Sequence, residues 1–96
     1  MKTYQIIVVG RVQGVGYRAH IHKLANSMNL KGNVRNLSDG NVKIILQGNE
    51  AQLKEMKKII LTKAHPFMNV TNTSIAEIPN LKTYNDFNIV YWLLLS

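Results

Sequence analysis

A glycine-rich segment near the N-terminus has the residue types and spacing of an anion-binding loop. It follows an apolar run, precedes a helical pattern, and reads Gly10-Arg11-Val12-Gln13-Gly14-Val15-Gly16-Tyr17-Arg18. Glycine lacks a Cβ, so such a loop can bend sharply and bring its backbone N–H groups close to an anion. If a helix begins near Tyr17, its unpaired N–H groups and the positive end of its dipole also face the loop.

Arg18 is the second unusual feature of this segment. A cation in the first turn of a helix is disfavoured by about 0.3 to 1 kcal/mol. A guanidinium that completes a phosphate site would explain such a residue, because its N–H donors match phosphoryl oxygens. A solvated arginine beside a glycine-rich surface turn is the alternative interpretation of this stretch alone.

Other loop motifs fit poorly. The run from Gly14 to Ala19 matches a dinucleotide fingerprint, but Asp39, at the expected distance, falls in a hairpin turn where a second parallel strand is required. A P-loop needs Gly-Lys-Ser/Thr, which does not follow. A phosphatase loop needs a cysteine nucleophile, and position 12 is Val12. If phosphoryl chemistry occurs here, water must attack.

Few groups near the loop could supply acid, base or metal chemistry. His20 and His22 are two positions apart on a predicted helix, so they point in different directions, and Asp39 is the one acid nearby. We therefore expect no metal and no cofactor. Such a site suits a bond whose leaving group needs no protonation, and a carboxylic–phosphoric anhydride is such a bond.

Size and composition limit the class of protein. The chain has 96 residues, no cysteine and a net charge of +7, from 12 Lys and Arg against 5 Asp and Glu. We expect one domain over residues 1–96, located in the cytoplasm, because no stretch resembles a signal peptide or a membrane span. The positive charge favours an anionic partner without identifying it.

Residue patterns predict seven elements. Alternation and β-branched residues indicate strands at 2–9, 31–37, 41–47, 70–78 and 87–93. Apolar spacing indicates a helix over 17–28 and a second helix from 49 to the His65-Pro66 pair. The expected buried helix positions are Ile21, Leu24, Ala25 and Met28 in the first, and Leu53, Met56, Ile59 and Ile60 in the second.

Local signals support these boundaries. Asp39-Gly40 indicates a hairpin, and Asn49 with Gln52 forms a capping-box pattern. We expect the apolar residues 92–95 to continue the last strand under a helix. The order βαββαβ, with a terminal strand or strand extension, predicts an α+β ferredoxin-like two-layer sandwich, with a mainly antiparallel sheet and two helices on one face.

Two motifs resemble signatures of the acylphosphatase family. The stretch 12–18 is similar to Val-Gln-Gly-Val-x-Phe-Arg, with Tyr17 in the place of Phe, and 32–42 is similar to Gly-aromatic-Val-x-Asn-x-x-Asp-Gly. The spacing of Arg18 and Asn36, the element order and the stretch 87–91 extend the resemblance over nearly the whole chain.

The resemblance implies a small metal-independent hydrolase that cleaves acyl phosphates to a carboxylate and inorganic phosphate. Arg18 and Asn36 would be the catalytic residues, with Asn36 orienting the attacking water. A phosphoryl oxygen of the substrate would take the proton, because an amide is no base at neutral pH. The phosphoryl group would be held by Arg18 and by the backbone N–H groups of Gln13, Gly14, Val15, Gly16, Tyr17 and Arg18.

Asn33 departs from the family pattern, which usually has a large aromatic residue at this place. We expect altered stability or substrate preference there, without loss of activity. We also expect a monomer that binds a small anionic acyl phosphate, and neither nucleic acid nor membrane.

Two other functions remain as alternatives. One is a non-catalytic anion- or nucleic-acid-binding ferredoxin-like module, although the third strand lacks the aromatic residues on which RNA bases stack. The other is an accessory domain, because larger hydrogenase-maturation proteins carry an acylphosphatase-like segment. The end of the chain at Ser96 favours the free enzyme.

Overall fold

The computed structural model describes residues 1–91. In chain order the elements are β1 (Lys2–Arg11), α1 (Tyr17–Ser27), β2 (Lys31–Asn36), β3 (Val42–Gly48), α2 (Glu50–Ile60), β4 (Asn69–Ile78) and β5 (Phe87–Val90). The predicted continuation of the last strand to residue 93, and the predicted packing of 92–95, lie outside the described residues.

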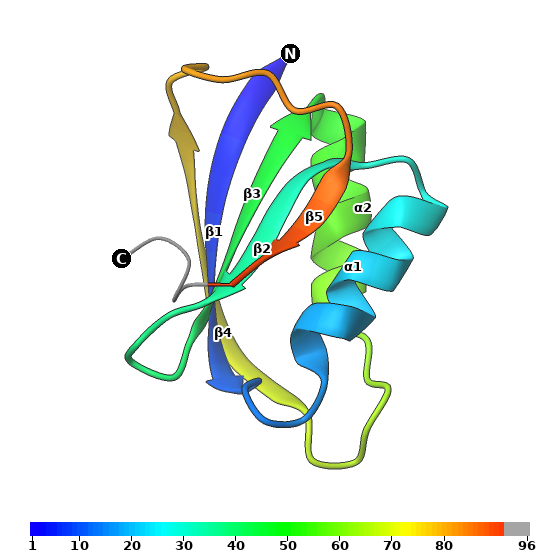
Figure 1. The fold of residues 1–96 in the computed structure, drawn as a ribbon, viewed down its shortest axis with the longest axis vertical. Coiled ribbons are helices and arrows are strands. Elements are labelled where there is room, and N and C mark those ends of the chain that lie inside the picture. Colours follow the sequence, from blue (N-terminus) through cyan, green and yellow to red (C-terminus); the bar gives the residue numbers. More distant parts are fainter. Residues whose placement is uncertain (92–96) are drawn as a thin grey trace.

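The five strands form one sheet in the order β4-β1-β3-β2-β5. The β1–β3, β1–β4 and β2–β3 pairs are antiparallel, whereas β2 and β5 run parallel. Both helices lie on the same face of this sheet (Figure 1). The predicted ferredoxin-like sandwich is confirmed, with β5 as the additional terminal strand.

The core lies between the sheet and the helices. Alternation along β1 buries Tyr4, Ile6 and Val8 on the helix side, as the sequence pattern predicts. The largest side chains buried with them include Tyr17 of α1 and Phe87 of β5. The helices therefore hold the strands from one side, and residues at alternate strand positions point away from them.

Both helices end earlier than predicted. The helix α2 ends at Ile60, before the His65-Pro66 pair, because the N–H groups of Leu61 and Thr62 close its last turn on the carbonyls of Lys58 and Ile59. Thus the proline lies in the loop that follows and does not itself end the helix.

The end of α1 also differs from the prediction. This helix ends at Ser27, and Asn29, with φ 54°, turns the chain toward β2. Met28 is 41% exposed, so its predicted burial is wrong, and Leu30, which is 2% exposed, enters the core instead. Leu24 and Leu53 are only partly buried against the core.

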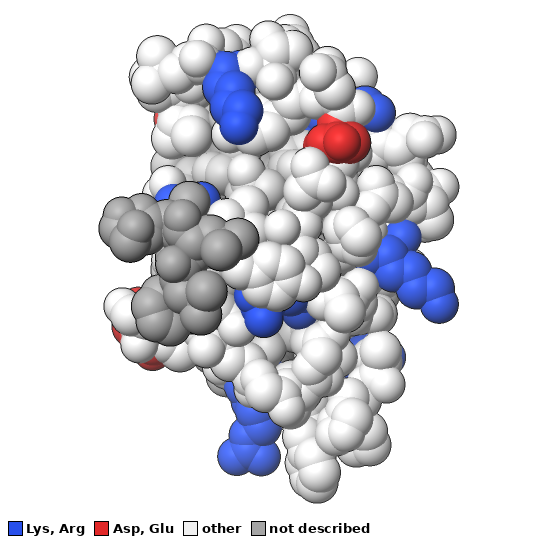
Figure 2. Space-filling model, in the orientation of Figure 1, with Lys and Arg blue, Asp and Glu red and all other residues white. Residues whose placement is uncertain are grey.

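Each helix has 11 residues, so within the described residues neither has the length and apolar character to span a membrane. On the face shown in Figure 2, Lys and Arg side chains are spread over the surface and outnumber Asp and Glu. This distribution agrees with the net charge of +7.

Candidate active site

The loop between β1 and α1 turns on two glycines in left-handed backbone conformations. Gly14 has φ 75° and Gly16 has φ 80°, and a Cβ at either position would meet no atom within 4 Å. The backbone conformation, and not a lack of space, is therefore what requires glycine at both positions.

The N-terminus of α1 is open. Gly16 is its N-cap residue, no side chain accepts a hydrogen bond there, and the first turn of the helix contains no acid. The first N–H groups of a helix have no partner within the helix, and the helix dipole makes this end positive. The end of α1 thus presents donors and positive potential to the loop, as the sequence predicts.

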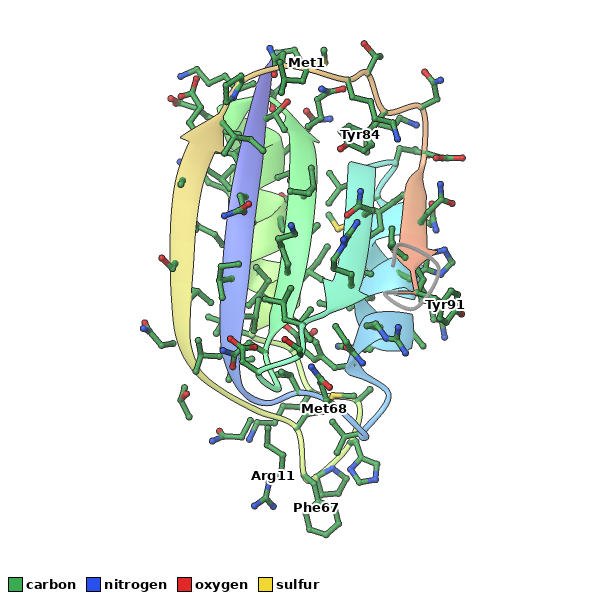
Figure 3. All side chains as sticks on the ribbon, turned by 60° about the vertical axis from the view of Figure 1, so that its left-hand side comes forward. Met1, Arg11, Phe67, Met68, Tyr84 and Tyr91 are labelled. Atoms are coloured by element: carbon green, nitrogen blue, oxygen red, sulfur yellow. The ribbon has the colours of Figure 1, made fainter. Side chains whose placement is uncertain are left out.

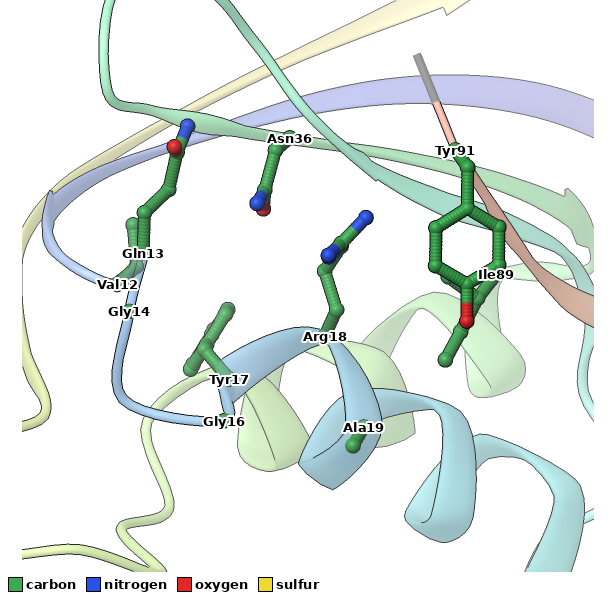
Figure 4. Close-up of a pocket in the computed structure, with 10 residues that line it drawn as sticks. All are labelled: Val12, Gln13, Gly14, Gly16, Tyr17, Arg18, Ala19, Asn36, Ile89 and Tyr91. Atoms are coloured by element: carbon green, nitrogen blue, oxygen red, sulfur yellow. The ribbon is translucent and has the colours of Figure 1, made fainter. Parts of the chain in front are cut away.

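Beside this helix end lies a pocket of about 230 Å³. Residues from the loop, α1, β2 and the end of β5 line it (Figure 4): Val12, Gln13, Gly14, Gly16, Tyr17, Arg18, Ala19, Asn36, Ile89 and Tyr91. The fold therefore brings Arg18 and Asn36, from α1 and β2, to the same pocket.

Gln13 ties the loop to the turn that follows β2. Its Nε2 donates hydrogen bonds to the carbonyl oxygens of Leu37 at 2.7 Å and Asn41 at 2.8 Å. Asp39 shapes the same turn, because its Oδ1 accepts from the N–H of Asn41 at 3.0 Å. The Gln13 side chain thus sets the distance between the loop and the strand end that carries Asn36, a role that the sequence motif did not indicate.

Asn36 lies at the C-terminal end of β2, on the helix side. Its side-chain oxygen Oδ1 is buried and has no hydrogen-bond partner among residues 1–91. A buried polar atom normally has a partner, so such an acceptor in a pocket indicates a place where a hydrogen-bond donor can bind. A water molecule or a substrate hydroxyl could meet this need.

Tyr17 contributes backbone to the pocket while its side chain points into the core. The ring is 1% exposed, and the hydroxyl donates to the carbonyl oxygen of Ile60 at 2.9 Å. Burial raises the pKa of the Tyr17 phenol well above its usual value, so the phenol stays neutral. It acts as a link between the start of α1 and the end of α2.

Arg18 approaches the pocket from the first turn of α1. Its guanidinium carbon lies over the ring of Tyr91, 5.1 Å from the ring centre. Within residues 1–91 the single ion pair joins Lys2 to Glu77, at 3.7 Å, so no carboxylate there neutralises Arg18. The arginine charge is thus available to an anionic ligand.

The structure places most of the predicted site residues together. Gln13, Gly14, Gly16, Tyr17, Arg18 and Asn36 all line the pocket, whereas the side chain of Val15 packs against the core and does not line it. Between residues 1 and 91, no group of three or more His, Asp or Glu side chains could hold a metal ion. His20 instead shares a hydrogen bond with Thr62 at 2.7 Å.

Sequence reasoning missed four residues that line the pocket. Val12 and Ala19 adjoin the predicted loop and could have been included by proximity. Ile89 lies in β5 and Tyr91 directly follows this strand, and only the parallel pairing of β5 with β2 brings them to the site. The resemblance named the stretch 87–91 but offered no role for it.

Comparison with known proteins agrees with this geometry. The family model for acylphosphatase matches residues 4–89. An acylphosphatase of Ligilactobacillus salivarius is 48% identical over 91 residues, which cover 95% of this chain and 100% of that protein. The crystal structure of acylphosphatase from Bacillus subtilis matches with a TM-score of 0.84 at 40% identity, over 95% of this chain and 100% of that one.

A larger protein contains a similar unit. The crystal structure of T. kodakarensis HypF matches with a TM-score of 0.82 at 31% identity, over 94% of this chain but 12% of the HypF chain. The stand-alone relatives, in contrast, match along their whole length. The family model and these full-length relatives confirm the predicted resemblance: the chain belongs to the acylphosphatase family, the enzymes that hydrolyse acyl phosphates.

Proposed function

We propose that this enzyme hydrolyses small anionic acyl phosphates by direct attack of water on phosphorus, with Arg18 and Asn36 as its catalytic residues. Arg18 and the backbone N–H groups of residues 13–18 hold the phosphoryl oxygens. Asn36 orients the water. The observation that carries this proposal is the convergence, at one pocket, of an open helix N-terminus with an arginine and an Asn36 oxygen for which residues 1–91 provide no carboxylate and no hydrogen-bond donor, respectively.

The phosphoryl group carries negative charge that spreads over its oxygens during transfer. Donors that are already in place stabilise this charge without reorganising at the moment of reaction. The first turn of α1 supplies such donors in a fixed geometry, and Arg18 adds a full positive charge. The site therefore acts by positioning and charge stabilisation.

The water molecule donates a hydrogen bond to Oδ1 of Asn36 and attacks phosphorus from the side opposite the acyl oxygen. The bond between phosphorus and the acyl oxygen breaks, and its electron pair leaves with the carboxylate. The proton of the water passes to a phosphoryl oxygen, because an amide does not accept it at neutral pH. The products are a carboxylate and dihydrogen phosphate, so the atoms and charges balance.

The leaving group explains why this hydrolysis needs so few titratable groups in the pocket. A carboxylate is a weak base and departs without protonation, whereas an alkoxide needs an acid. Among the described residues, no Asp, Glu or His lines the pocket. Acyl phosphates are therefore the phosphate compounds best suited to this site, and phosphate monoesters of alcohols are poor ones.

The test is hydrolysis of acetyl phosphate in the presence of a metal chelator by the parent, Arg18→Ala and Asn36→Ala. We expect an active parent and a fall in kcat/KM of at least about 100-fold in each variant, the usual cost of a preorganised donor. His22→Ala is the control, because this histidine lies on α1 but does not line the pocket. It should keep the parent activity.

Circular dichroism and urea unfolding identify variants that fail to fold. A folded Arg18→Ala or Asn36→Ala variant with parent activity would refute its assigned role. A parent that the chelator inactivates would refute the metal-independent mechanism.

A nucleic-acid-binding role has less support. On the face of the sheet that points away from the helices, β1 and β3 place Thr3, Gln5, Ile7, Lys43, Ile45 and Gln47, and none of these is aromatic. Base stacking usually needs aromatic rings on such strands. We further propose that the enzyme is monomeric and cytoplasmic and has no nucleic-acid partner. Size-exclusion chromatography tests the oligomeric state.

A further inference from the structure

We infer that Tyr91 is a positioning residue for the reaction, because its ring holds the guanidinium of Arg18 at the pocket. The guanidinium carbon lies 5.1 Å from the centre of this ring, and both residues line the pocket (Figure 4). This inference rests on the proposed role of Arg18 and assigns a partner that keeps that arginine in place.

Strand pairing brings Tyr91 to the catalytic end of the sheet. Val90 of β5 lies beside Arg35 of β2 in parallel register. The same register, continued by one residue, places Tyr91 beside Asn36. The helix α1 packs against both strands, so one end of this unit collects Arg18, Asn36 and the Tyr91 ring. Figure 3 shows Tyr91 at this end of β5, while Tyr84 precedes the other end of the strand.

An arginine in this position needs a means of orientation. The positive end of the α1 dipole repels its charge, and its long side chain is free to turn toward solvent unless something holds it. A carboxylate would hold it, but would also occupy its N–H groups and neutralise its charge. The negative face of an aromatic ring also attracts the guanidinium, but it leaves the N–H groups of the arginine free to bind a ligand.

Several features separate positioning from a purely structural role. Tyr91 is 50% exposed, so its ring contributes little to the core. No hydrogen bond of its hydroxyl is found in the described part of the chain. The aromatic face of Tyr91 therefore orients Arg18. We expect phenylalanine at this position to keep that function, whereas an aliphatic side chain of similar bulk should lose it.

The experiment compares Tyr91→Phe and Tyr91→Leu with the parent. Calorimetry measures the dissociation constant for inorganic phosphate, and kinetics give kcat and KM for acetyl phosphate and benzoyl phosphate. For Tyr91→Leu we expect about 2- to 30-fold weaker phosphate binding and a similar loss of kcat/KM on both substrates, the range for a cation–π contact. Tyr91→Phe should stay within about twofold of the parent.

Tyr84→Leu is the matched control. Lys82 lies over the Tyr84 ring at 5.2 Å, so this variant also removes a tyrosine–cation contact, but neither residue lines the pocket. It should bind phosphate and hydrolyse acetyl phosphate as the parent does. In an Arg18→Ala background, Tyr91→Leu should weaken phosphate binding no further, because the ring acts through Arg18.

Three results would overturn the inference. The first is a folded Tyr91→Leu variant with parent phosphate affinity. The second is a loss confined to benzoyl phosphate, which would make the ring a contact for the acyl group. The third is a loss of phosphate affinity on Tyr91→Leu that is equal in the parent and in the Arg18→Ala background. If the parent binds phosphate but hydrolyses no acyl phosphate, the proposed function fails while the binding measurements still test the role of Tyr91.

Discussion

The two helices have the same length but opposite kinds of N-terminus. At α2, Asn49 and Gln52 form a complete capping box, Glu50 stands in the first turn, and Lys57 and Lys58 stand in the last. At α1, Gly16 provides no capping side chain and the first turn contains no acid. The N-terminus of α2 therefore has the capping and acidic residues that stabilise a helix end, whereas the N-terminus of α1 has neither.

The difference shows where the chain gives up stability for binding. A capping side chain at Gly16 would occupy the N–H groups that face the pocket, and an acid there would repel an anionic substrate. The N-terminus of α2 is instead closed by its own side chains: Oδ1 of Asn49 accepts from the N–H of Gln52, and Oε1 of Gln52 accepts from the N–H of Asn49. An unsatisfied helix end beside a pocket is thus evidence for an anion-binding site, whereas a capped end is part of the scaffold.

The largest expected effect comes from giving α1 an acidic cap. Gly16→Asp places a carboxylate at the open N–H groups, and Gly16→Asn places an uncharged side chain of the same shape there. Both types tolerate the left-handed conformation, and a Cβ has space. We expect the Asp variant to have at least about 100-fold lower kcat/KM for acetyl phosphate than the Asn variant. Equal activity in the two variants would contradict an anion site at this helix end.

Removing the link between the helices should affect stability more than activity. Tyr17→Phe deletes the hydrogen bond to the carbonyl of Ile60, which is buried, and should lower the free energy of unfolding by about 1.5 kcal/mol. We expect kcat/KM to change by less than about threefold, because the phenol points away from the pocket and phenylalanine keeps the ring. Urea unfolding and acetyl phosphate kinetics check both values.

The same substitution should alter the pH dependence of stability. The folded state raises the pKa of Tyr17 above its usual 10.0. Above that pH the unfolded chain loses the proton while the folded chain keeps it, so the stability contributed by this group is present below 10.0 and falls as pH rises further. Unfolding midpoints of the parent should therefore fall more steeply above this pH than those of Tyr17→Phe. Parallel curves would show that Tyr17 is not the group responsible.

Removing the cap of α2 should cost stability alone. Asn49→Ala deletes the acceptor for the N–H of Gln52, at 2.9 Å, and should lower the free energy of unfolding by about 1 kcal/mol. The kcat/KM for acetyl phosphate should equal that of the parent. A folded Asn49→Ala variant with impaired catalysis but unchanged stability would break the contrast between the two helix ends.

The smallest expected effect concerns β2, whose alternate residues face different surroundings. Asn33 points to the side opposite Val34 and Asn36 and lines a separate hollow of about 260 Å³ with Tyr84 and Asn88. Its side-chain oxygen is buried without a partner among the described residues. Asn33→Trp should fill part of this hollow and change the free energy of unfolding by less than about 1 kcal/mol.

Activity measurements complete that test. Because Asn33 does not line the catalytic pocket, the KM for acetyl phosphate should not change. Of the two expectations from sequence, altered stability and altered substrate preference, the geometry favours the first. A changed KM with an unchanged unfolding midpoint would reverse this assignment.

Several features could be predicted from the sequence because they depend on near neighbours. The capping box at Asn49, the hairpin at Asp39 and the glycine turn before α1 each involve residues within a few positions of one another. The end of α2 could not be predicted in this way. The proline suggested a later end, whereas the last turn closes on its own carbonyls and the Tyr17 hydroxyl bonds to Ile60.

The sequence by itself thus determined the types and order of the elements, the conformations that Gly14 and Gly16 permit, and the identity of Arg18 and Asn36 as candidates. Tertiary structure alone decided that Gln13 braces the loop against the β2–β3 turn and that Tyr91 lies over Arg18. These contacts join residues far apart in the chain, and the pairing of β5 with β2 sets the second of them. Such pairing depends on how the whole sheet packs against the helices, which no local pattern specifies.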